Sequence, residues 1–143
     1  MNIFFEKLMN IAENSDVSTP ENGLVLFSVS FLPTKENKEQ AVLYVKQNEG
    51  KVLIDDTVCG RELIENGIEK ETVDLSPEMK TKIWATASKR MIKAAKGNVT
   101  AFVKDADRRS VFCSVELPEI LKNEKIMTIN GEDKKEFASK ILQ

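Results

Sequence analysis

Two short stretches in the second half of the chain hold residue types that suit chemistry on a positively charged group. Residues 83–90 contain the only tryptophan, Trp84, and place Ser88 one helical turn after it. Residues 110–118 place a single carboxylate, Glu116, within a mostly apolar run. Removing an ionised carboxylate from water costs several kcal/mol unless it is paired. An aromatic ring and such an acid together suit a pocket that binds a flat cation and stabilises a developing positive charge.

Each of these residues also has an ordinary structural interpretation. Taken alone, Trp84 fits a core aromatic at the edge of an apolar helix stripe. Ser88 fits a serine that is solvated or bonded to its own backbone. Glu116 fits a solvent-facing residue that shares a strand face with Ser114. No single residue therefore decides between function and packing.

Two neighbouring aspartates form a further candidate for binding. Asp55 and Asp56 follow the predicted strand 51–54 directly, and ligands of open α/β sheets bind beyond the carboxyl ends of the strands. The alternative is that the two carboxylates cap the helix predicted over residues 61–68.

Length and composition are those of an ordinary globular protein. The 143 residues predict one domain over residues 1–143, with 41% hydrophobic and 31% charged residues, a net charge of −2 and a pI near 5.4. The chain has no histidine, so catalysis must use carboxylates, hydroxyls, lysine, arginine or cysteine. Cys59 and Cys113 have no zinc-site spacing and are expected as small buried side chains.

The patterning predicts an α/β protein with a small, largely parallel sheet flanked by helices and an N-terminal helical segment. Strands are expected at residues 24–31, 51–54, 98–104, 111–117 and 126–129. Helices are expected from the N-terminus to residue 13, over residues 39–47, 61–68, 77–96 and 118–121, and after Asn130-Gly131. The helix from residue 77 has the clearest start, because Ser76 caps it and Pro77 takes its first position.

The order of the candidate residues resembles that of the ADP-ribosyl cyclase / NAD glycohydrolase family. Phe27-Ser28, then Asp55-Asp56-Thr57, then Trp84 and Ser88, then residues 112–116 follow one another as in that family. The resemblance covers roughly residues 26–129 and extends to bacterial, toxin-borne domains of this type. It implies a cyclase-like fold and activity on NAD.

The resemblance implies a role for each matching residue. Glu116 matches the catalytic glutamate, and Trp84 matches an aromatic residue that stacks on the substrate. The other implied substrate contacts are Ser88 beside the ribose and phosphates, Asp55 and Asp56 as the acidic pair near nicotinamide, Phe27 at the place of a second tryptophan, and Ser28 on the phosphate side.

Three positions depart from the family pattern. Asp55 is one methylene shorter than the glutamate usual there, and Phe27 replaces a frequent tryptophan. Val29 stands where animal members often have an arginine, so a phosphate contact is lost or supplied elsewhere. These departures favour an alternative in which the same fold binds a nucleotide without cleaving it, or inhibits a partner protein.

The expected activity is that of an NAD+ glycohydrolase, with cyclisation competing where the pocket excludes water. NAD is the substrate, and neither a cofactor nor a metal is expected. No nucleic acid or membrane partner is expected, although an inhibitory protein would accompany a toxin. A tRNA-cutting toxin would need the basic residues of the long helix as a groove; we interpret Lys82, Lys89, Arg90, Lys93 and Lys96 as a solvated face. The absence of the family's multiple disulfides favours the cytosol, either of the producing cell or of a target cell.

Overall fold

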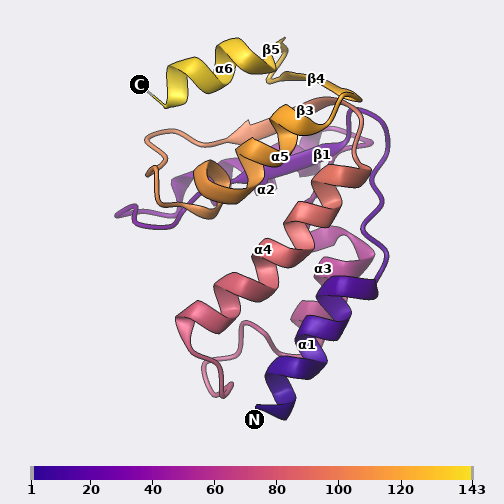
Figure 1. Ribbon diagram of the computed structural model, residues 1–143, viewed down its shortest axis with the longest axis vertical. Coiled ribbons are helices and arrows are strands. Elements are labelled where there is room, and N and C mark those ends of the chain that lie inside the picture. Colours follow the sequence, from indigo (N-terminus) through magenta and orange to yellow (C-terminus); the bar gives the residue numbers. More distant parts are fainter. Residues whose placement is uncertain (1, 143) are drawn as a thin grey trace.

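The computed structural model describes residues 2–142, which build a central sheet with helices on both of its faces (Figure 1). The sheet has five strands in the order β2-β1-β3-β4-β5. The strands are β1 (Leu24–Phe27), β2 (Val52–Leu53), β3 (Gly97–Phe102), β4 (Ile126–Ile129) and β5 (Glu132–Asp133). The first four in this order are parallel neighbours, and β5 returns antiparallel to β4. The predicted α/β class and largely parallel sheet are confirmed, with one antiparallel edge strand.

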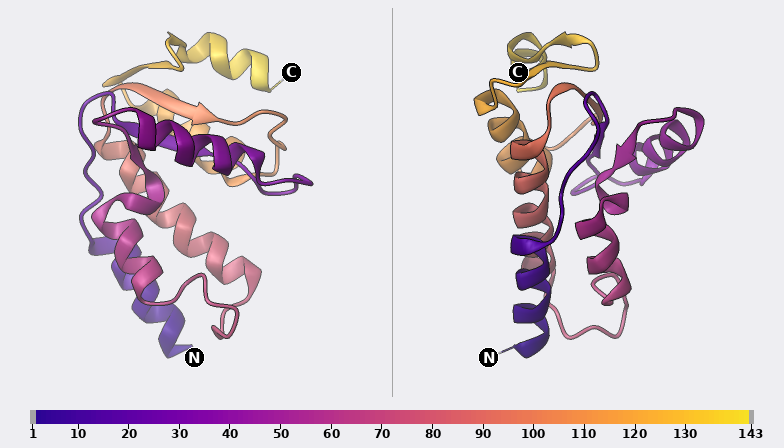
Figure 2. Two further views of the ribbon diagram at one scale, coloured as in Figure 1. Left: turned by 180° about the vertical axis from the view of Figure 1, so that it is seen from behind. Right: turned by 90° about the vertical axis from the view of Figure 1, so that its right-hand side faces the viewer.

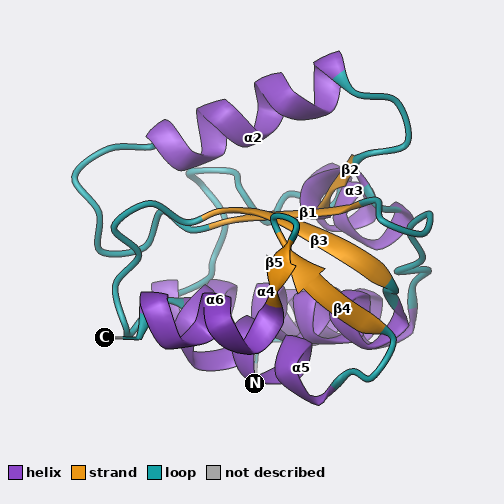
Figure 3. Cartoon of the chain, turned by 90° about the horizontal axis from the view of Figure 1, so that it is seen from above, coloured by secondary structure: helices purple, strands orange, loops and turns teal. Residues whose placement is uncertain are grey.

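The helices divide between the two faces of the sheet. They are α1 (Ile3–Asn14), α2 (Glu36–Gln47), α3 (Val58–Glu65), α4 (Pro77–Ala94), α5 (Leu117–Lys122) and α6 (Lys134–Ile141). Viewed along the sheet, α2 covers one face alone, while α4, α5 and α6 lie on the other (Figure 3). Helix α1 packs against α4 and α3, and the three extend together away from the sheet (Figures 1 and 2). None of the helices in the described part of the chain combines the length and apolar character that a membrane crossing requires.

Two apolar clusters of very different size stabilise the molecule. The main core joins α1, α3, α4, α5 and α6 to one face of the sheet, around fully buried side chains such as Ile83, Met91 and Phe112. The second cluster lies under α2 and has only Val25, Ala41 and Leu53 at its buried centre. Cys59 and Cys113 are buried, as predicted, and do not form a disulfide with each other.

The long helix α4 begins where its capping signal predicts. The Ser76 hydroxyl accepts a hydrogen bond from the Met79 amide at 3.1 Å, and Pro77 takes the first helical position. The apolar positions Ile83, Ala87 and Met91 recur one turn apart and are fully buried. This spacing turns the neighbouring side chains, Trp84 among them, toward the edge of the core.

The predicted strand over residues 111–117 is wrong. Residues 112–116 form a π-helical turn, η2 (Phe112–Glu116), which continues into α5. The Leu117 amide donates to the Phe112 carbonyl, five residues back, and Pro118 has no amide hydrogen with which to restore the usual spacing of four. Phe112, Glu116 and Ile120 are all buried, so helical burial overrides the strand preference of the local side chains.

The first strand also ends earlier than the apolar run 24–31 predicts. The Ser28 amide still donates to the Phe102 carbonyl at 3.1 Å, but the chain then leaves the sheet toward α2. Phe31 has a φ of 65°, in the left-handed region, and its side chain is exposed. Such a backbone conformation does not fit a strand, whatever the β propensity of phenylalanine.

Candidate active site

A cavity of about 280 Å³ opens where the carboxyl ends of β1 and β2 meet the start of α4 and η2. Its lining includes residues from both strand ends, from α2, from the connection after α3, from α4 and from η2. Five of the residues predicted for the site from the sequence are among them: Phe27, Ser28, Asp55, Trp84 and Glu116. The fold therefore brings together side chains that are up to 89 positions apart in the chain, from residue 27 to residue 116.

Glu116 is a buried carboxylate that faces this cavity. Its side chain is only 3% exposed, and it ends the π-helical turn rather than a strand. Burial raises the pKa of Glu116 from 4.5 to about 7, and a hydrogen bond with Ser88 partly opposes that rise. At neutral pH the group is therefore close to half-ionised, and a cation in the cavity would favour its charged form.

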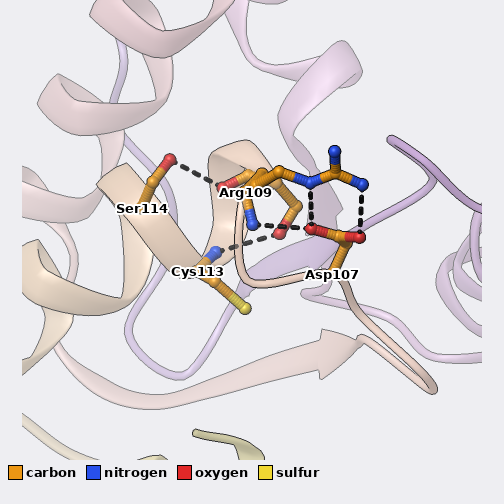
Figure 4. Close-up of polar contacts among 5 residues, drawn as sticks. Asp107, Arg109, Cys113 and Ser114 are labelled. Carbon is orange, nitrogen blue, oxygen red and sulfur yellow. Dashed lines mark hydrogen bonds and ion pairs between the residues drawn. The ribbon is translucent and has the colours of Figure 1, made fainter.

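Ser110 fixes the start of the segment that presents Glu116. Its hydroxyl accepts from the Cys113 amide at 3.2 Å, and its carbonyl accepts from the amide and hydroxyl of Ser114 (Figure 4). Just before it, Arg109 forms two hydrogen bonds of 2.9 Å with the Asp107 carboxylate. These contacts order the second half of the loop between β3 and η2.

Trp84 is half-buried and lines the cavity with its indole. The indole N–H donates to Oε1 of Glu69 at 2.8 Å, which joins α4 to the connection after α3. Ser88 follows on the next turn but lies in the core, outside the cavity lining. Its hydroxyl donates to the Ala85 carbonyl at 3.3 Å. Ser88 also bears on Glu116, since it partly opposes the rise in the pKa of that group.

Asp55 reaches the cavity because the chain turns tightly after β2. Residues 54–56 form a 3₁₀ turn, η1 (Ile54–Asp56), closed by a 2.9 Å hydrogen bond from the Thr57 hydroxyl to the Ile54 carbonyl. Burial raises the pKa of Asp55, and Lys38, whose Nζ lies 3.9 Å from its carboxylate, opposes that rise. Asp56 is exposed and is not among the cavity residues, so the structure separates the predicted acidic pair. Neither aspartate caps α3, because Thr57 does so.

Ser28 presents to the cavity a hydroxyl that has no hydrogen-bond partner within residues 2–142. The side chain is 4% exposed and its oxygen is unpaired. Its backbone is held firmly, because the Asn37 amide donates to the carbonyls of Ser28 and Lys104 at 2.8 and 3.0 Å. A buried unpaired hydroxyl is destabilising unless a ligand or water bonds to it, so Ser28 is suited to hold a polar ligand atom.

Several cavity residues are not predicted from the sequence. Lys35 and Lys38 come from the start of α2, Lys80 and Thr81 from α4, and Glu69 from the connection between α3 and α4. Lysines in an exposed helix and a glutamate in a charged connection have no distinguishing spacing, so no sequence signal separates them from solvated side chains. With Asp55 and Glu116, they give the cavity three carboxylates and three ammonium groups.

Metal binding has no evident site here. Within residues 2–142, no three cysteine, aspartate or glutamate side chains lie in an arrangement that would hold a metal ion.

Comparison with known proteins finds structures with a similar fold but no related sequence. No known family model matches the chain, and no curated protein matches it in sequence. Among solved structures, it is similar to an ADP-ribosyl cyclase with a glutamate-to-alanine mutation, with a TM-score of 0.53 and 17% identity. It is also similar to an ADP-ribosyl cyclase complexed with N1-cIDPR, with a TM-score of 0.53 and 18% identity. Each match covers 77% of this chain and 48% of the other, so the chain spans about half the length of those cyclases. The protein therefore has an ADP-ribosyl cyclase-like fold.

Proposed function

We propose that this protein cleaves the bond between nicotinamide and ribose in NAD+, as a glycohydrolase. One observation supports this most directly: a single cavity is lined by the indole of Trp84 and by the buried carboxylate of Glu116. The similar solved structures, which are ADP-ribosyl cyclases, agree with this class of reaction. The residue order that resembles the family agrees with it as well.

The reaction needs a group that stabilises positive charge more than it needs an acid. When the bond between the ribose C1′ and the ring nitrogen breaks, its electron pair stays on nitrogen and nicotinamide leaves neutral. The ribose becomes oxocarbenium-like, and an ionised Glu116 beside C1′ stabilises that charge. Water then adds to C1′ and releases a proton, giving ADP-ribose. A dry cavity strengthens the electrostatic effect of the carboxylate.

Trp84 and Asp55 suit the departing pyridinium ring. A cation over an indole face gains about 0.5–2 kcal/mol, and the attraction disappears as the ring becomes neutral. Asp55 lines the same cavity, and the sequence resemblance matches it to one member of the family's acidic pair. The proposed substrate contacts are therefore Trp84 and Asp55 at the ring, Glu116 at the ribose, and Phe27 and Ser28 at the strand end. Ser88 acts through Glu116.

The cavity is too small for a whole dinucleotide. Its volume of about 280 Å³ lies just under the roughly 300–1,000 Å³ of typical ligand sites. Lys35 and Lys38 border both this cavity and a shallow depression on the outer side of α2. We propose that the nicotinamide riboside half enters the cavity, while the diphosphate lies against these two lysines. They would supply the positive charge that Val29 cannot.

Replacing Lys35 and Lys38 together by glutamine should raise the KM for NAD+ about tenfold and change kcat little. Removing contacts to a part of the substrate that does not react weakens the ground and transition states equally, and each exposed ion pair is worth up to about 1 kcal/mol. Steady-state kinetics measure this split. Replacing Lys93 and Lys96 together by glutamine, both exposed at or just beyond the end of α4 and outside the cavity lining, controls for the change of two units in net charge. An unchanged KM in the double variant would place the diphosphate elsewhere.

The proposed function is tested by incubating the purified protein with NAD+ and separating the products. We expect nicotinamide and ADP-ribose in equal amounts, with cyclic ADP-ribose as a smaller product where water is excluded. Tight binding of NAD+ or ADP-ribose without turnover would favour instead a protein that holds a nucleotide. Neither turnover nor binding would contradict both functions.

A further inference from the structure

One acidic contact in the cavity has no place in the chemistry described above. Glu69 lies in the connection between α3 and α4, is exposed on its outer side, and lines the cavity. Its Oε1 accepts the only hydrogen that the Trp84 indole can donate, at 2.8 Å. Glu69 and Trp84 therefore form one unit in the cavity wall, built from two separate elements.

The hydrogen bond fixes how the indole faces the cavity. A tryptophan side chain has a broad χ2 preference, so packing alone leaves the plane of a half-buried ring loosely defined. A hydrogen bond with a charged acceptor is short and roughly twice as strong as a neutral one. Because Gly67 has a φ of 90° and its carbonyl accepts from the Lys70 amide at 3.1 Å, a defined turn presents Glu69 to the ring.

The charge of Glu69 also acts inside the cavity. Its carboxylate is close enough to Asp55 to contribute to the raised pKa of that group, together with Asp56. Lys38 offsets part of the negative charge at Asp55, and Lys80 lines the same cavity from α4. Glu69 thus adds a negative charge beside the indole. This charge attracts a cationic flat ring and gives a neutral ring no comparable stabilisation.

We propose that Glu69 is a positioning and specificity residue: it orients the Trp84 indole and makes the cavity prefer cationic over neutral flat rings. The choice of ring rests on the proposed function, since NAD+ contains a pyridinium and its product nicotinamide does not. Preference for the cation would also help the neutral product to leave. Glu69 does not touch the bond that breaks, so its role is distinct from that of Glu116.

The orientation is tested on the free protein, without any activity. Trp84 is the only tryptophan, so near-ultraviolet circular dichroism and fluorescence report on this indole alone. Glu69→Gln keeps an oxygen acceptor, and its indole spectrum should match the wild type. Glu69→Ala removes the acceptor and should weaken the indole dichroism and shift the emission. Glu71→Gln, two residues further on, exposed and outside the cavity lining, is the matched control.

The specificity is tested with two small probes, 1-methylnicotinamide as the cation and nicotinamide as the neutral ring. Saturable quenching of Trp84 fluorescence gives a Kd for each. In Glu69→Gln the Kd of the cation should rise about three- to fivefold, as expected for one partly screened charge, while that of nicotinamide stays constant. Glu69→Ala should weaken both probes. The same two substitutions are then made in a Trp84→Phe protein, with the Kd values measured by calorimetry. There, Glu69→Ala should weaken probe binding no more than Glu69→Gln does, because phenylalanine has no N–H to orient.

The results separate this inference from the proposed function. A Glu69→Ala protein whose spectrum and two Kd values match those of Glu71→Gln would overturn the inference, even if NAD+ is hydrolysed. If the wild-type protein bound neither probe, the proposed preference for cationic over neutral rings would be wrong. A wild type that binds the cation preferentially, loses that preference in Glu69→Gln and yet leaves NAD+ intact would contradict the hydrolase alone.

Discussion

Replacing Glu116 by glutamine should lower kcat for NAD+ cleavage by about 10²–10³, because a neutral amide cannot stabilise the ribose cation as a preorganised carboxylate does. Glutamine has nearly the same size, and Glu116 has no ion-pair partner that its loss would strand in the described part of the chain. The KM should change far less than kcat, since the lost interaction forms mainly in the transition state. Initial rates of nicotinamide release measure both constants.

The same carboxylate sets an expected pH dependence. Because burial raises the pKa of Glu116 to about 7 in the ligand-free protein, the kcat/KM for NAD+ should rise through that pH as Glu116 ionises. Stability should run the other way. Between pH 4.5 and 7 the folded protein keeps a proton that the unfolded chain has released, so the free energy of unfolding falls as pH rises. At pH 8, Glu116→Gln should be the more stable protein, by as much as ~3 kcal/mol before the cost of burying the amide.

A second buried glutamate provides the control. Glu119 lies one turn further along the same helical segment, but Lys89 and Lys122 neutralise it at 3.5 and 3.9 Å. Glu119→Gln should leave kcat and its pH profile as in the wild type. If Glu116→Gln and Glu119→Gln turned over NAD+ at equal, robust rates, Glu116 would have no part in the chemistry.

Replacing Gly60 by alanine should destabilise the protein by about 3 kcal/mol. A Cβ at Gly60 would lie 2.8 Å from the carbonyl carbon and oxygen of Asp55, and closer still to the Ile54 carbonyl oxygen. These are backbone atoms of η1, which cannot move without displacing the Asp55 side chain. An ordinary helix position would instead gain stability from alanine. Urea unfolding measures the loss, and an impaired KM for NAD+ in the folded fraction would show the displacement of Asp55.

Gly50 separates steric contact from backbone strain. It has a φ of 79°, and a Cβ added at this position would have no neighbouring atom within 4 Å, so Gly50→Ala meets strain without a clash. We expect a loss of about 1 kcal/mol and an unchanged KM. If Gly60→Ala and Gly50→Ala lost the same stability, α3 would be able to shift away from η1 with little cost, and Gly60 would not position Asp55.

The parts of this fold that the sequence predicts are those with local signals. The cap at Ser76, the apolar period of α4 and the short β-branched strands each result from neighbouring residues, and the structure contains them. The segment 111–117 has strand-forming side chains, yet it is helical because Phe112 and Glu116 must both face inward one turn apart. Their burial depends on the elements that pack around this segment, so the local sequence pattern does not predict it.

The candidate site shows the same division. Trp84 and Glu116 stand out in the sequence because a lone indole and a lone acid in an apolar run are unusual. Lys38 and Glu69 are ordinary surface residues in the sequence, and only the approach of α2 and of the α3–α4 connection brings them to the cavity. Asp56 is predicted for the site from the sequence but does not line the cavity. A 3₁₀ turn places consecutive side chains in different directions, and only Asp55 faces inward.

Helix α2 packs on the sheet through a small apolar cluster, which affects how easily this helix opens locally. Its fully buried apolar contacts are limited to Val25, Ala41 and Leu53, beside the half-buried ring pair of Tyr44 and Phe102. The Asn37 amide adds a polar link to the ends of two strands. Transient opening of α2 therefore requires less free energy than global unfolding. An anion held both by Lys35 and Lys38 and by cavity residues outside α2 would suppress that opening by mass action, so ligand occupancy and local order of the helix would rise together.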